Sequence, residues 1–180
     1  MAPLITLLAV TLLLRAAGAA GVRPLRSWLT SLRGGLAAMF TLTGTTHFND
    51  MRGDLVAMVP PALPYPELLV TVTGLLELLA AAGLLYRRTA PWAAGGLTLL
   101  LVAMFPANVH AALAGLTVNG EPATALLPRT LMQLVFVAAT AAVVLPYMRA
   151  LSPGRPAAIR SAWTASTLES LPECGSGPTE

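Results

Sequence analysis

Six polar side chains lie inside, or at the ends of, long apolar stretches of this chain. They are His47, Thr73, Glu77, Asn108, His110 and Gln133. Polar and ionisable groups are costly in a hydrocarbon environment, so such residues are candidates for a binding or proton-transfer site. We therefore treat these six as candidate ligand-binding residues and assign no catalytic residue.

Glu77 is the deepest of these groups. It lies ten residues into an apolar segment of about one membrane thickness, which places it roughly 15 Å from the helix end and near the bilayer midplane. A carboxyl group at that depth must be protonated or hydrogen-bonded, and Thr73, one turn earlier, shares its helix face. Two interpretations stay open: a neutral glutamic acid that joins two helices, and a proton-relay or ligand-binding carboxyl group.

The stretch "MFPANVHAAL" adds Asn108 and His110 to a second apolar segment. Pro106 has no N–H, so the carbonyl of Val102 loses its helical partner. Being two residues apart, Asn108 and His110 point in different directions on a helix. We expect an outer polar layer of His47, His110, Gln133 and Glu67 above a deeper one of Glu77, Asn108 and Thr73.

Two histidines on different helices could also be axial ligands of a non-covalent haem b. A histidine near a membrane interface is more often a hydrogen-bonded interfacial residue, so we favour a quinone over haem b while the cofactor stays unknown. Cys174 is the one cysteine of the chain, so there is no CxxC or CxxCH motif. We assign no metal site.

The elements that must position these groups are apolar helices. The chain is 56% hydrophobic and 11% charged, whereas a soluble domain is about 25% charged. Its apolar blocks are long enough to cross a bilayer, which needs about 20 residues each. The sequence therefore predicts an all-α, polytopic transmembrane helix bundle with five spans: Pro3–Gly21, Trp28–Phe48, Glu67–Tyr86, Pro91–Ala114 and Pro128–Tyr147. Arg33 lies inside the second span and is expected to snorkel to the lipid headgroups.

The basic residues predict the orientation of these spans. All eleven are arginines, and most of them lie between and after the apolar blocks. This placement fits membrane topology better than nucleic-acid binding. With the N-terminus outside, nine fall on the cytoplasmic side, and only Arg52 and Arg129 fall outside. This bias predicts a multi-pass protein of the bacterial plasma membrane with a cytoplasmic C-terminal tail.

Three regions follow from this pattern. Residues 1–21 form an N-terminal transmembrane helix, residues 22–148 the four-helix membrane domain, and residues 149–180 a disordered tail rich in Ser, Thr, Pro and Gly. The first block could instead be a cleaved signal peptide, but its positive charges follow the apolar core, whereas those of a signal peptide precede it. We favour a retained helix.

The loop between the second and third spans contains "MVPPALPYPELL". Its prolines exclude a continuous helix. We expect a short amphipathic helix over Met51–Val59, then an extended hairpin, with Pro66 in the first turn of the next helix. The segment is either a plain interfacial connector or a lid that buries His47 over a cavity open to hydrophobic ligands.

Three strings of the sequence resemble the DoxX family of small bacterial membrane proteins. They are "RGGLAAMFTLTGTTHF", "MVPPALPYPELLVTVTGLLELLAAAGLL" and "APWAAGGLTLLLVAMFPANVHAAL", within a resemblance that covers roughly Leu32 to Tyr147. The resemblance implies a four-helix transmembrane core, to which the first helix is an addition. It also implies a link to thiosulfate:quinone oxidoreductase and redox-stress complexes, with recurring polar positions at His47, Glu77, Asn108 and His110. This chain lacks membrane cysteines for thiol or sulfur chemistry.

Three functions remain open from the sequence. The first is a membrane subunit of a quinone-linked redox or redox-homeostasis system, acting with a redox-protein partner or as a homo-oligomer. The second is a structural or partner-binding membrane protein without a ligand. The third is a carrier or binder of a small hydrophobic compound.

Overall fold

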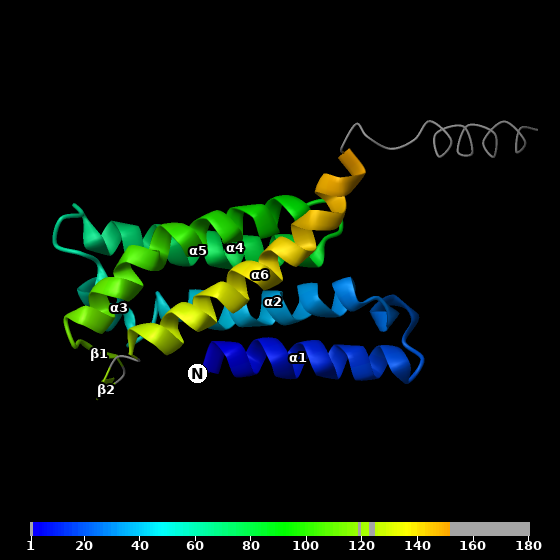
Figure 1. Ribbon diagram of the computed structural model, residues 1–180, viewed down its shortest axis with the longest axis horizontal. Helices are drawn as coiled ribbons and strands as arrows, with labels where there is room; N and C mark the ends of the chain where they lie inside the picture. Colours follow the sequence, from blue (N-terminus) through cyan, green and yellow to red (C-terminus); the bar gives the residue numbers. More distant parts are fainter. Residues whose placement is uncertain (1, 119, 123–124, 152–180) are drawn as a thin grey trace, which may run out of the picture. The chain divides into compact units, whose positions relative to one another are not determined.

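The computed structural model describes residues 2–118, 120–122 and 125–151, and these form an all-α bundle (Figure 1). The predicted fold class is therefore confirmed. The predicted tail from residue 152 onward lies outside the described residues. The elements are α1 (Ala2–Ala19), the 3-10 helix η1 (Arg23–Arg26), α2 (Trp28–Thr46), α3 (Arg52–Met58), α4 (Pro66–Leu85), α5 (Ala90–Leu113), the two-residue strands β1 (Thr117–Val118) and β2 (Glu121–Pro122), and α6 (Leu126–Leu151).

Four helices are long and apolar enough to cross a membrane within the part of the chain that the structure describes. They are α1, α4, α5 and α6, as expected for a multi-pass membrane protein. Their surfaces are rich in exposed large apolar side chains, such as Trp92 at 82% and Leu99 at 71% exposure. Exposed apolar side chains on such a scale need lipid as a neighbour.

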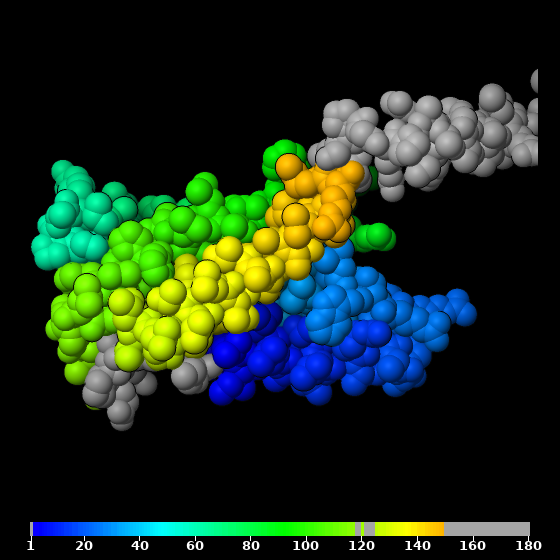
Figure 2. All heavy atoms as spheres, viewed as in Figure 1, coloured from blue at the N-terminus to red at the C-terminus, as the bar shows by residue number. Residues whose placement is uncertain are grey.

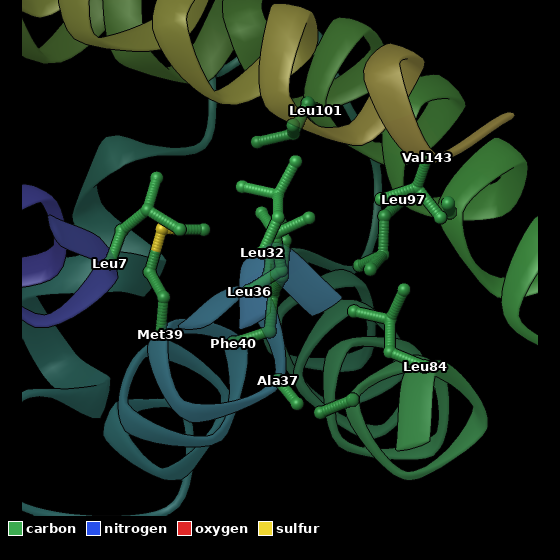
Figure 3. Packing of buried hydrophobic residues seen from close by; sticks show 12 residues of the cluster. Leu7, Leu32, Leu36, Ala37, Met39, Phe40, Leu84, Leu97, Leu101 and Val143 are labelled. Carbon is green, nitrogen blue, oxygen red and sulfur yellow. The ribbon is translucent and has the colours of Figure 1, made fainter. Parts of the chain in front are cut away.

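The second predicted span, α2, is more enclosed by protein than these four helices. It is not among the four helices that qualify by length and hydropathy, and nine of its nineteen residues are buried. Leu36 lies between Leu7 of α1 and Leu97 of α5 (Figure 3). Because its neighbours are mostly protein, α2 can hold more polar side chains than a helix that faces lipid.

Arg33 of α2 is also placed differently from the prediction. The expectation that it snorkels to the headgroups is wrong: its side chain is only 5% exposed. The Arg33 Nε donates a hydrogen bond of 2.8 Å to the carbonyl of Leu84, near the end of α4. The last carbonyls of a helix have no intrahelical partner, so a buried guanidinium can bind there.

The last helix, α6, is joined to α5 by polar contacts. The Thr98 hydroxyl donates to the Thr140 hydroxyl at 2.8 Å, and the Gln133 side-chain amide donates to the carbonyl of Leu101. Leu101 immediately precedes Val102, whose carbonyl has no helical partner because Pro106 has no N–H. In Figure 2 the side chains of α6, yellow to orange, cross the front of the molecule as an oblique band with the green of α5 on one side and the blue of α1 and α2 on the other.

The proline-rich loop folds only in part as the sequence predicts: in place of the expected extended hairpin there is a turn, in which the N–H of Leu63 donates to the carbonyl of Pro60 at 2.9 Å. Helix α3 covers Arg52–Met58, within the expected Met51–Val59. Pro66 is the first residue of α4, where a missing N–H costs little. Tyr65 before it adopts a left-handed conformation, with φ 53° and ψ 57°. This uncommon backbone geometry turns the chain sharply into α4.

Candidate functional site: an apolar cavity beneath α3

A cavity of about 200 Å³ lies beneath α3 and the segment that follows it. We call residues 52–63 the lid, because Leu55, Met58 and Leu63 form part of the cavity wall. The other walls come from α4, from α5 around its internal Pro106, and from the residue after α2. Most lining side chains are apolar, and the polar ones are His47, Thr73 and Asn108.

His47 follows the last residue of α2 and is 4% exposed. Its Nδ1 lies 3.0 Å from the carbonyl oxygen of Thr43, one turn earlier. A carbonyl can only accept, so Nδ1 is the donor and carries a proton. The structure thus fixes both the position of the imidazole and its tautomer.

Close approach of α4 holds the other side of His47. A Cβ atom on Gly74 would lie 2.4 Å from the His47 Cβ and 2.7 Å from its Cγ. No side chain larger than hydrogen fits there without displacement of the imidazole. Gly44 of α2 also permits a close approach, since a Cβ atom added there would lie 2.9 Å from two atoms of Leu78.

Arg52 joins the lid to the helices on either side of it. Its guanidinium donates to the carbonyl of His47 at 3.1 Å, to the carbonyl of Glu67 at 3.1 Å and to the hydroxyl of Thr71 at 2.9 Å. At the other end of α3, the Nδ1 of His110 donates to the carbonyl of Met58 at 3.1 Å. Both ends of α3 are therefore held by side-chain hydrogen bonds.

Glu77 lies away from the cavity. Its carboxylate accepts a 2.6 Å hydrogen bond from the hydroxyl of Thr43 on α2, and the side chain is 4% exposed. Thr73, expected to share a polar face with Glu77, instead donates its hydroxyl to the carbonyl of Leu69. The contact of Glu77 thus links two helices, in keeping with one of the two interpretations that the sequence left open.

The structure brings three of the six candidate residues to one cavity and places three elsewhere. His47, Thr73 and Asn108 line the cavity. Glu77 is hydrogen-bonded to α2, His110 to the lid and Gln133 to α5. The two imidazoles do not share the cavity, so this geometry gives no support to a haem held between them.

Two residues that position the site were not among the sequence candidates. Thr43 forms hydrogen bonds with both Glu77 and His47. Its position one helical turn before His47 could have indicated the second contact. Arg129 of α6 donates to the Oδ1 of Asn108 at 3.0 Å. The sequence placed this arginine outside with Arg52, but spacing alone does not show which side chain it contacts.

No curated protein and no solved structure matches this chain. The sequence model of a family described as a domain of unknown function (DUF8561) matches residues 36–145. This match includes α3, α4, α5 and every residue that lines the cavity. The chain therefore belongs to the DUF8561 family of proteins of unknown function.

Proposed function

We propose that this chain is a membrane subunit of a quinone-linked redox or redox-homeostasis system and binds the quinone ring beneath α3. The observation that carries the proposal is the cavity of about 200 Å³, apolar over most of its wall and with His47 and Asn108 at its polar points. An apolar enclosure with few polar groups is the usual form of a small-molecule site.

The size of the cavity supports a ring-sized ligand. A cavity of about 150 Å³ already holds benzene, whereas sites for drug-sized ligands span roughly 300–1,000 Å³. The space of about 200 Å³ fits one substituted ring but not a long hydrocarbon tail. A membrane quinone meets this restriction if its ring enters the cavity and its tail stays in the lipid.

The resemblance to the DoxX family supports the redox part of the proposal. It carries the link to quinone-dependent enzymes, and a redox-protein partner would then exchange electrons with the quinone, whether this chain acts as a single copy or as a homo-oligomer. The arginine distribution supports a location in the bacterial plasma membrane with the N-terminus outside and the tail cytoplasmic. In that orientation the lid and cavity lie near the outer surface.

The test is a substitution that fills the cavity. Ala107→Phe places a phenyl ring among the lining residues, whereas Val102→Phe places one on a neighbouring position that is 57% exposed and does not line the cavity. Tetramethylbenzoquinone and its quinol are each dialysed against protein in lipid nanodiscs, with protein-free nanodiscs as the reference. We expect wild type and Val102→Phe to bind at least one of the two forms, and Ala107→Phe to bind it roughly tenfold more weakly, a loss of about 1.4 kcal/mol.

Equal binding by all three proteins, or no binding above the protein-free reference, would contradict the proposal. The latter result would favour a structural or partner-binding protein, for which the interhelical hydrogen bonds of Glu77 and Gln133 are the supporting observation. Binding without any electron transfer to a partner would instead favour a carrier of small hydrophobic compounds.

A further inference from the structure

The polar groups of the cavity differ in what they can offer a ligand. The Nδ1–H of His47 donates a hydrogen bond to the carbonyl of Thr43. A neutral imidazole has one N–H, so its Nε2 is a bare acceptor. This nitrogen has no hydrogen-bond partner within the described part of the chain.

The surroundings of His47 favour the neutral imidazole. The side chain is 4% exposed, and it forms no ion pair with an acidic residue of the described segments. The Arg52 guanidinium, which bonds the carbonyl of His47, places a positive charge close to the imidazole. A second positive charge beside it, removed from water, would be unfavourable.

The packing leaves one edge of the His47 ring available to the cavity. The Cβ and Cγ atoms of His47 pack against Gly74, and Nδ1 is turned to the carbonyl of Thr43. The opposite edge of the ring carries Nε2 and remains for the cavity that His47 lines. The cavity therefore presents a hydrogen-bond acceptor at this wall.

Asn108, which lies on α5, offers the cavity a hydrogen-bond donor where His47 offers an acceptor. Its Oδ1 accepts from the guanidinium of Arg129 at 3.0 Å, which orients the amide. Its Nδ2 then carries two N–H groups, and no partner for them lies in residues 2–118, 120–122 or 125–151. The hydroxyl of Thr73, the third polar residue of the wall, donates its hydrogen bond to the carbonyl of Leu69. Asn108 is thus the donor of the cavity, while His47 and Thr73 are acceptors.

We infer that the cavity selects a ligand whose apolar ring carries a hydroxyl group, so that the reduced quinol binds in preference to the quinone. This inference rests on the proposed function and names the ligand form that the same site takes. A hydroxyl group donates to the Nε2 of His47 and can also accept from the Nδ2 of Asn108. A quinone carbonyl can only accept, so it leaves His47 without a partner. A site with a buried polar group discriminates against analogues that leave it unpaired.

The first test compares matched ligands on the unchanged protein. Tetramethylhydroquinone, its dimethyl ether and tetramethylbenzoquinone share one ring, but only the first has a hydroxyl donor. Binding to wild type in lipid nanodiscs is measured anaerobically by equilibrium dialysis, with the partition into protein-free nanodiscs subtracted. We expect the quinol to bind roughly tenfold more tightly than the ether and the quinone, from about one hydrogen bond to a buried acceptor.

Substitution at His47 locates the source of the preference. His47→Phe keeps a planar ring at the wall and removes Nε2, so the quinol should lose its roughly tenfold advantage while the ether still binds. Val102→Phe, on the exposed surface of α5, should retain the advantage.

The outcomes separate this inference from the proposed function. Equal affinities of wild type for the quinol and the ether would overturn the inference and leave the cavity-binding function standing. Failure of all three ligands to bind would overturn both. A quinol preference that survives in His47→Phe would also overturn the inference, because the selecting group would then lie elsewhere.

Discussion

At the level of single residues, Thr43 holds two buried polar side chains at once. Its hydroxyl donates to the carboxylate of Glu77, and its carbonyl accepts from the imidazole of His47. The first contact joins α2 to α4 and the second orients a wall of the cavity. One threonine thus connects the buried carboxyl group of Glu77 with the candidate ligand site.

Removal of the Thr43 hydroxyl should destabilise the protein. Thr43→Val keeps the side-chain shape but leaves the buried carboxyl group of Glu77 without its donor, at a cost of about 1–3 kcal/mol. A thermal unfolding scan in detergent should show a lower midpoint, by roughly 2–4 °C per kcal/mol for a chain of this size. Thr45→Val is the control, since this exposed hydroxyl bonds only the carbonyl of Leu42 in its own helix. Equal midpoints for the two variants would show that Glu77 does not depend on Thr43.

At the level of elements, the site depends on how closely α2 and α4 approach. Gly44 and Gly74 lie where the two helices meet, and a Cβ atom at either position would lie 3.0 Å or less from a side chain of the other helix or its C-terminal cap. Gly96 of α5 has open space around its Cα. Small residues therefore matter at the α2–α4 contact and not at every glycine of the bundle.

This difference predicts opposite effects for two glycine substitutions. Gly74→Ala should destabilise by about 1–3 kcal/mol through overpacking and should weaken ligand binding, because the imidazole of His47 must move. Gly96→Ala should be neutral or stabilise by about 0.5–1 kcal/mol, since alanine is the better helix former and nothing obstructs it. Thermal unfolding and quinol binding measured on both variants test this. Similar losses in both would argue against the close approach at Gly74.

At the level of the whole molecule, the apolar helices indicate a multi-pass membrane protein, and the arginines predict its orientation. Four helices are long and apolar enough to span, and α2 is covered largely by its neighbours. Arg33 and the carbonyl of Leu84 meet near the end of α4 that leads to Arg87 and Arg88. The lid with Arg52 follows the opposite end of α2.

Labelling of single cysteines tests the proposed orientation. In a Cys174→Ser background, Ala62→Cys lies in the exposed part of the lid and Tyr86→Cys lies exposed after α4. A membrane-impermeant maleimide on intact cells should label position 62 and reach position 86 only after permeabilisation, as the positive-inside rule requires. The reverse pattern would invert the topology and place the cavity near the cytoplasmic surface.

The sequence by itself determined most of the helical elements, including the short helix in the proline-rich loop. Apolar length predicts a spanning helix, and proline predicts where one must begin or break, because both effects act over neighbouring residues. The bounds of α3 and the start of α4 at Pro66 were accessible for this reason. The interior position of α2 was not, because it depends on which helices surround it.

Only the tertiary structure decided which polar groups meet. Glu77 pairs with Thr43, 34 residues away, and not with Thr73 on its own helix face. His47, Thr73 and Asn108 converge on one cavity, whereas His110 and Gln133, equally plausible by spacing, bond to backbone carbonyls. Helical periodicity fixes the direction of a side chain relative to its own helix. The rotation and separation of neighbouring helices, set here by close contacts such as that of Gly74 with His47, decide what the side chain reaches.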